Sequence, residues 1–173
     1  MPRLPILALK EMPEKTRSMI TGGKSELSAL NINKMVAHAE NSARHFMRLS
    51  NSLLTQGQLD ARLRELAILR IATLCDSHYE WYQHEIIAKQ AGVPEEQIQA
   101  VRQSKESPVF NQQERAVLRY TEEVTLQVKS SEAAFEELTQ FLSHRELVEL
   151  TLVIGLYNMV ARFLENTGVE IES

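Results

Sequence analysis

Residues 66–75, Leu-Ala-Ile-Leu-Arg-Ile-Ala-Thr-Leu-Cys, are apolar almost throughout and contain a single charged side chain, Arg70. Residues 151–160, from Thr151 to Val160, have a similar composition. A helix without a polar face is buried on all its sides. We therefore expect these two segments to form the centre of a helical bundle.

The rest of the chain from about residue 32 onward is also helical in pattern. Apolar residues recur at helical spacing, and the few glycines and prolines fall between the periodic segments. The helices expected on this basis cover residues 32–55, 59–75, 77–91, 94–104, 112–129, 132–142 and 144–165. No run of alternating β-branched residues predicts a strand. The fold class is therefore all-α, with an N-terminal arm at 1–30, a loop at Gly22-Gly23-Lys24-Ser25, and a helical domain at 31–173.

Composition narrows the class of protein. The chain has 173 residues, 43% of them hydrophobic and 24% charged, as in an ordinary soluble single domain. Its net charge is −4 and its basic residues are scattered, which argues against nucleic acid as a partner. No signal peptide is recognised, and the longest apolar run, near 150–160, is interrupted by Asn158 and flanked by charge, so no membrane span is expected. A single cysteine excludes an internal disulfide and is consistent with a cytoplasmic location.

Residues 75–85, Cys-Asp-Ser-His-Tyr-Glu-Trp-Tyr-Gln-His-Glu, hold most of the chemically versatile side chains. On a helix, Ser77, Glu80 and His84 share one face, because they are three and four residues apart. Upstream, Glu65 lies on an apolar helix face, where burial would raise the pKa of its carboxyl group. A perturbed carboxylate beside a histidine is an arrangement used for proton transfer.

Structural roles explain the same residues equally well. Ser77-His-Tyr-Glu80 has the spacing of a capping box, as do Asn111-Gln-Gln-Glu114 and Ser143-His-Arg-Glu146. A lone histidine on a helix is often structural. Cys75, at a helix end, could be a mildly activated thiol, although buried structural thiols are commoner. From the residues alone, the choice between a reactive site and an ordinary helix start stays open.

Other chemistries fit less well. His84-Glu85-Ile-Ile-Ala88 begins like the zinc motif H-E-x-x-H but has alanine in place of the second histidine. We therefore expect neither a metal nor another cofactor. A metal site made by Glu80, His84 and Glu65 is the alternative.

The segment from Arg64-Glu65 through Tyr79-Glu80-Trp81 and His84 to Ala91-Gly92-Val93 resembles the carboxymuconolactone decarboxylase family, which includes the alkylhydroperoxidase-D-like proteins. Residues around His38 and from Tyr157 to Phe163 extend the resemblance to about residues 30–170. The resemblance implies a multi-helix orthogonal bundle, a homo-oligomer and a pocket with Glu65, Glu80 and His84 as catalytic groups. It also implies that His38, Ser77 and Asn158 bind substrate.

One departure from the family's redox pattern separates two activities. The redox branch carries Cys-x-x-Cys, but these positions hold Ser77 and Glu80 here, and Cys75 lies two residues too early. A dithiol peroxidase needs both thiols. The resemblance therefore points to the decarboxylase-type branch, a lyase acting on a small organic acid with Glu80 and His84. The alternatives are antioxidant activity and a non-catalytic, oligomeric small-ligand-binding protein.

Overall fold

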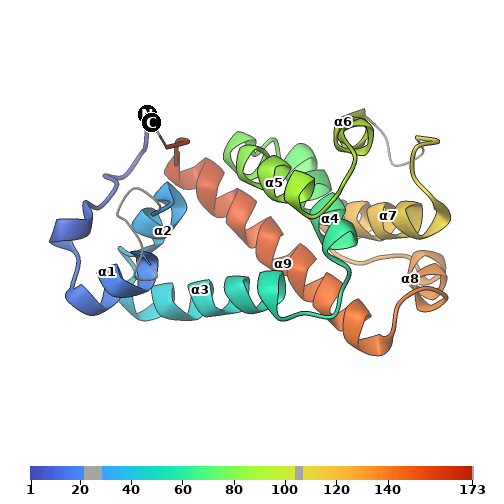
Figure 1. The fold of residues 1–173 in the computed structure, drawn as a ribbon, viewed down its shortest axis with the longest axis horizontal. Helices are drawn as coiled ribbons and strands as arrows, with labels where there is room; N and C mark the ends of the chain where they lie inside the picture. The colour runs from blue at the N-terminus through green and yellow to red at the C-terminus, as the bar shows by residue number, and fades with distance from the viewer. Residues whose placement is uncertain (22–28, 104–106, 173) are drawn as a thin grey trace.

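The computed structural model describes residues 1–21, 29–103 and 107–172 (Figure 1). Helices make up the regular structure in this part of the chain, and no strand occurs in it, which confirms the all-α prediction. A short 3-10 helix at Leu9–Glu11 precedes the α-helices. The α-helices in chain order are α1 (Glu14–Thr21), α2 (Asn31–Val36), α3 (Glu40–Thr55), α4 (Ala61–Leu74), α5 (His78–Gln90), α6 (Glu95–Gln103), α7 (Gln112–Gln127), α8 (Glu132–Thr139) and α9 (His144–Thr167). The loop expected at Gly22–Ser25 lies outside the described residues.

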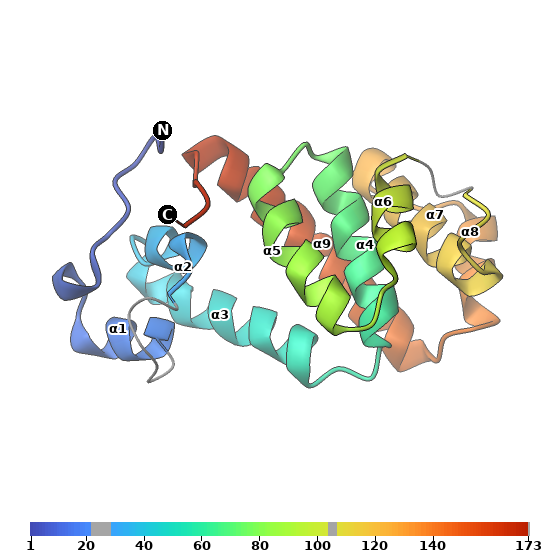
Figure 2. The same ribbon diagram turned by 45° about the horizontal axis from the view of Figure 1, so that its top comes forward.

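Helix α4 is the centre of the bundle, as its sequence predicts. It packs against α5, α6, α7 and α9, and the side chains of Leu66, Ile68 and Ile71 are completely buried. Asp60 begins this helix by accepting hydrogen bonds from the backbone amides of Arg62 and Leu63. Figure 2 shows α4 and α5 side by side, with α9 passing behind them.

Helix α9 is only partly enclosed, which corrects the prediction that residues 151–160 are buried on all sides. Val153, Ile154 and Leu156 are buried, whereas Leu152 and Met159 are 48% and 50% exposed. By length and composition α9 could cross a membrane, but half of its most apolar stretch is buried inside the domain, as in the core helix of a soluble protein.

The helix expected over 32–55 is two helices, because the chain turns between α2 and α3. Ala39 departs from helical geometry at φ −95° and ψ 66°. The turn is closed by hydrogen bonds from the amides of His38 and Ala39 to the carbonyls of Met35 and Val36. No glycine or proline marks this corner, so composition gave no sign of it.

The N-terminal segment contains its own helices and packs on the bundle. Leu9, Met12 and Ile20 form a small buried cluster with Ala29 and Ala37. The N-terminal segment is joined to the end of α9, where the amide of Arg3 donates to the carbonyl of Thr167, and Figure 1 shows both chain ends at the upper edge of the molecule.

Candidate active site

His84 is held in place by a carboxylate on the neighbouring helix. Its Nδ1 lies 2.7 Å from Oε2 of Glu65, and both side chains are buried. The other oxygen of Glu65 accepts a hydrogen bond of 2.9 Å from Nε of Arg64. Because a carboxylate accepts, Nδ1 of His84 donates, which leaves Nε2 as the atom available to a ligand.

A third side chain fixes the plane of the imidazole. The ring of Tyr157, on α9, meets that of His84 edge to face, with centroids 4.7 Å apart and an interplanar angle of 86°. Tyr157 is itself buried, and its pKa is raised by burial first and then by the negative charge of Glu65. Its hydroxyl is therefore a neutral group in this site.

Glu80 lies one helical turn before His84 and has a different environment. It is 2% exposed, and neither carboxyl oxygen has a hydrogen-bond partner in the described part of the chain. Burial, and secondarily the charge of Glu165, raises the pKa of Glu80 well above its usual value. An unpartnered carboxylate is costly to bury, so burial favours the neutral acid form of this side chain.

The capping-box reading of Ser77 and Glu80 is wrong. Ser77 does precede α5, but its side chain makes no capping bond, and its Oγ is buried without a partner in the described residues. The boxes predicted at Asn111–Glu114 and Ser143–Glu146 are both present, with reciprocal hydrogen bonds. The same spacing therefore gives a cap at two helix starts and a free carboxyl group at the third.

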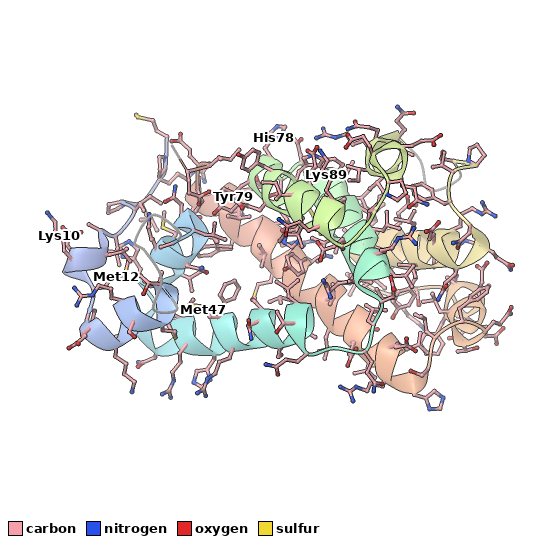
Figure 3. All side chains as sticks on the ribbon, viewed as in Figure 1. Lys10, Met12, Met47, His78, Tyr79 and Lys89 are labelled. Atoms are coloured by element: carbon pink, nitrogen blue, oxygen red, sulfur yellow. The ribbon has the colours of Figure 1, made fainter. Side chains whose placement is uncertain are left out.

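Glu80, His84 and Tyr157 line a cavity of about 300 Å³ enclosed by α2, α3, α5 and α9. Its other walls are largely apolar, with Phe46, Leu54 and Leu164 among them. Tyr79 on α5 and Met47 on α3, both labelled in Figure 3, belong to the same lining. Among the described residues no lysine or arginine lines this cavity, which makes His84 the one lining side chain able to carry a positive charge.

Two of the three predicted catalytic residues line the cavity, and the third lies behind them. Glu80 and His84 face the cavity, whereas Glu65 lies behind His84, outside the lining, and positions it. The predicted substrate-binding residues are elsewhere. His38 bonds the carbonyl of Pro5 through Nε2 at 2.8 Å, and Asn158 donates to Thr125 and to the carbonyl of Ile154.

His38 lines a second, apolar cavity of about 550 Å³, shared between α2, α3 and α9. Phe46 and Val160 line both cavities and so form part of the wall between them. A larger groove of about 1060 Å³ between α1 and α3 contains none of the predicted site residues. The chemistry-bearing side chains are thus gathered at the 300 Å³ cavity.

Cys75 is half-buried, at the end of α4. Its Sγ lies 4.0 Å from Oδ1 of Asn158, and burial raises the pKa of its thiol. A raised pKa disfavours the nucleophilic thiolate. In the described residues, no group of three or more histidine, cysteine, aspartate or glutamate side chains is placed to hold a metal ion.

Sequence reasoning missed Tyr157 as a site residue. Its position in a nearly apolar helix gave one signal, because a buried tyrosine hydroxyl normally needs a polar neighbour or a cavity. Its contact with His84 depends on how α9 packs against α5, which spacing along the chain does not reveal.

Residues 40–123 match the model of the carboxymuconolactone decarboxylase family, which confirms the family resemblance over that segment. No functionally curated protein matches the chain significantly. A protein of unknown function from Agrobacterium tumefaciens, named in relation to the antioxidant defence protein AhpD, is 26% identical, with a TM-score of 0.73 over 79% of this chain and 95% of that one.

Two further structures have the same fold at lower identity. An uncharacterised peroxidase-related protein with an alkylhydroperoxidase AhpD core, from Ralstonia eutropha, has a TM-score of 0.87 at 18% identity, covering 99% of this chain and 93% of that one. The debrominase Bmp8 bound to 2,3,4-tribromopyrrole has a TM-score of 0.83 at 16% identity, covering 100% and 95%. These two matches confirm the alkylhydroperoxidase-D-like fold. The family match over residues 40–123 and the Agrobacterium protein support an enzymatic or antioxidant role at the level of the family.

Proposed function

We propose, starting from the carboxymuconolactone decarboxylase family match over residues 40–123, that the chain is an acid/base enzyme acting on a small organic acid in the cavity beside His84. One observation carries the proposal. Glu80 and His84 lie one turn apart on the same cavity wall in opposite environments, one without hydrogen-bond partners and the other held by Glu65. Titratable groups whose environments differ in this way can act as acid and base in one reaction.

The roles follow from the two environments. Glu80, whose pKa burial raises well above its usual value, holds its proton to a higher pH than an exposed carboxyl group does and can donate it to the substrate. His84 donates through Nδ1 to Glu65, so Nε2 can accept a proton or, once protonated, face a substrate carboxylate. Glu65 does not line this cavity and acts on His84 as a positioning residue.

Decarboxylation of a β-keto acid or related lactone acid is the reaction this pair fits best. The bond between the α-carbon and the carboxylate breaks, carbon dioxide leaves, and the electron pair forms an enolate. Glu80 then donates its proton to that carbon, and solvent reprotonates Glu80 through the same cavity. An apolar lining favours the step because the charge, localised on the substrate carboxylate at the start, is spread over the enolate as carbon dioxide leaves.

The peroxidase alternative has weaker support. It requires a thiolate and a resolving thiol, whereas the chain has one cysteine, half-buried and with a raised pKa. The debrominase of similar fold binds a small flat ring, and a ring of that size is compatible with a cavity of about 300 Å³. Ring-containing acids therefore belong among the compounds to be tried.

The test is carbon dioxide release from a panel of β-keto acids and unsaturated lactone acids. Glu80→Gln and His84→Gln are each expected to lower kcat/KM by about 10²–10⁴-fold, as loss of a general acid or base does. Glu85→Gln is the control for turnover, because Glu85 is on the same helix but outside the cavity lining, where it accepts from Lys89 and Trp81. Turnover insensitive to both site variants would contradict the proposal, and tight binding without turnover would favour a ligand-binding protein.

A further inference from the structure

The groove of about 1060 Å³ between α1 and α3 has basic side chains on both of its helices. Arg44 and Arg48 lie one turn apart on α3, and Lys15 lies on α1. Glu40 is the one acidic residue of the described lining, so the groove carries three positive charges and one negative charge. The chain as a whole has a net charge of −4. We refer to this basic region as the α3 groove, and Figures 1 and 2 show α1 beside the first turns of α3.

The cations of the α3 groove are not neutralised by the described part of the chain. Nε of Arg44 donates to Nε2 of His45 at 3.0 Å, which is a neutral acceptor, and neither Arg48 nor Lys15 has an ion pair there. Like charges one turn apart lower the stability of a helix. Arginines elsewhere do have acidic partners: Arg62, Arg64, Arg70, Arg119 and Arg145 each pair with a glutamate. The α3 groove thus keeps an uncompensated positive charge that a bound anion would balance.

A phosphate group fits this set of cations better than a carboxylate does. Arg44 and Arg48 are separated by about 6 Å along the helix axis, and each guanidinium group can form paired hydrogen bonds to one anion. A phosphate monoester has three free oxygens and a charge of about −1.5 to −2 at neutral pH, so it can meet both arginines and Lys15 together. A carboxylate has two oxygens and a single charge.

The α3 groove adjoins the site cavity. Met47 and Asn51, one turn apart on α3, line both of them. The side chain of Met47 is half-buried, and a methionine side chain is unbranched and adapts its shape readily. Met19 and Leu49 add further apolar surface to the groove. A ligand with its anionic end in the groove therefore has an apolar path along α3 toward the cavity.

We propose that the α3 groove binds the phosphate end of an elongated small molecule whose apolar stem passes Met47 and Asn51 and ends beside Glu80 and His84. The far end of the stem rests on the proposed function, for which it names a substrate class, an acid that carries a phosphate monoester. Holding the phosphate outside the cavity provides binding energy without placing its charge among apolar walls.

Calorimetric titration with octyl phosphate, which cannot be decarboxylated, tests the groove without any turnover. Arg44→Gln and Arg48→Gln are each expected to raise the dissociation constant about tenfold, as loss of a charge-assisted contact does. Glu40→Gln should lower it, because the variant removes the negative charge of the groove. Added sodium chloride should weaken binding. Lys129→Gln is the control, because Lys129 is exposed beyond the end of α7 and outside the groove lining.

Comparison of octyl phosphate with ethyl phosphate tests the path of the stem. The longer chain is expected to bind at least about tenfold more tightly, because part of it is buried. It should also shift the imidazole NMR signals of His84, which are identified by their absence in His84→Gln, whereas ethyl phosphate should not. Met47→Trp fills the boundary between groove and cavity and should remove both differences. Asn51→Trp should do the same from an exposed position, where the larger side chain does not disturb the core.

A dissociation constant unchanged in both arginine variants would overturn the phosphate site. Octanoate that binds as tightly, with the same dependence on Arg44 and Arg48, would overturn the choice of phosphate. Signals of His84 that octyl phosphate leaves in place would overturn the path into the cavity. Sedimentation with vesicles of phosphatidylcholine and phosphatidic acid, without binding of octyl phosphate in solution, would assign the groove to a lipid headgroup instead. Binding as expected, in a protein that releases no carbon dioxide from any acid, would support the groove and contradict the proposed reaction alone.

Discussion

Nδ1 of His84 lies 2.7 Å from Oε2 of Glu65, a buried contact between α5 and α4 that determines which face of the imidazole reaches the cavity. The same carboxylate accepts from Arg64, which is also buried. The pair is thus both a structural contact within the core and the support of the proposed base.

Glu65→Gln tests that double role. The amide can still meet His84, but Arg64 is left buried beside a neutral group, and breaking a buried ion pair typically costs about 3–5 kcal/mol. We expect a loss of this order in the free energy of unfolding, measured with urea, and a fall in kcat at constant KM. Glu96→Gln, at an exposed position of α6, should change neither quantity appreciably. A fully stable Glu65→Gln variant would mean that Arg64 finds another partner.

Glu80→Gln tests the neutral buried acid through pH. The pKa of Glu80 is raised in the folded state above its usual 4.5. The folded protein therefore binds a proton that the unfolded chain releases, and stability is highest below pH 4.5 and is lost as the pH rises through the folded pKa. Glutamine has no titratable carboxyl group, so Glu80→Gln removes this contribution to the pH dependence of stability. The variant should match the unchanged protein near pH 4.5 and exceed it in stability at pH 8.

The opposite pattern would be equally informative. A Glu80→Gln variant less stable than the unchanged protein at pH 8 would show that the carboxylate has a donor and is ionised in the fold. Urea unfolding at several pH values, with Glu96→Gln on α6 as the exposed control, distinguishes the two outcomes.

The sequence predicted the part of the site that depends on local geometry. Glu80 and His84 are four residues apart on one helix, so helical spacing alone places them together. The apolar stretch at residues 66–75 likewise predicted a buried central helix, and α4 contains this stretch up to Leu74. Both predictions required only the period of a helix and the composition of its faces.

Predictions that depended on packing between distant segments fared differently. His38 and Asn158 were expected in the pocket, but the turn at residues 37–39 directs His38 to Pro5, and Asn158 bonds Thr125 of α7. The edge contact between Tyr157 and His84 depends on the relative placement of α9 and α5. Each of these contacts joins two elements that are far apart in the sequence, so the spacing of residues along one helix does not predict it.

Three serine or asparagine side chains at helix starts give a matched stability series. Asn111→Ala and Ser143→Ala remove capping bonds and should each lower the free energy of unfolding by about 1 kcal/mol. Ser77→Ala removes a buried hydroxyl without a partner and should be within about 0.5 kcal/mol of the unchanged protein or slightly more stable. A loss of about 1 kcal/mol at Ser77 would restore the capping-box reading of Glu80.

The C-terminal tail ties two walls of the site cavity together through Glu172. Its carboxylate accepts from the amide of Asn31 at 2.6 Å, the hydroxyl of Tyr79 at 2.7 Å and the side chain of Gln83 at 2.7 Å. Tyr79 and Gln83 line the cavity, and Asn31 begins α2. Glu172 thus holds the α2 wall against the α5 wall.

Glu172→Ala should loosen this tie. Burial alone would raise the pKa of Glu172, but the hydrogen bonds that its carboxylate accepts outweigh burial and lower this pKa. The ionised carboxylate therefore stabilises the folded protein above the usual pKa of 4.5, and this stabilisation is lost as the pH falls through the folded pKa. At pH 7 we expect a loss of about 1–3 kcal/mol in the free energy of unfolding and faster amide hydrogen exchange at α2. Glu170→Ala, which removes only a surface pair with the N-terminus, is the control. Equal effects of the two variants would show that the tail stabilises the chain without bracing the cavity.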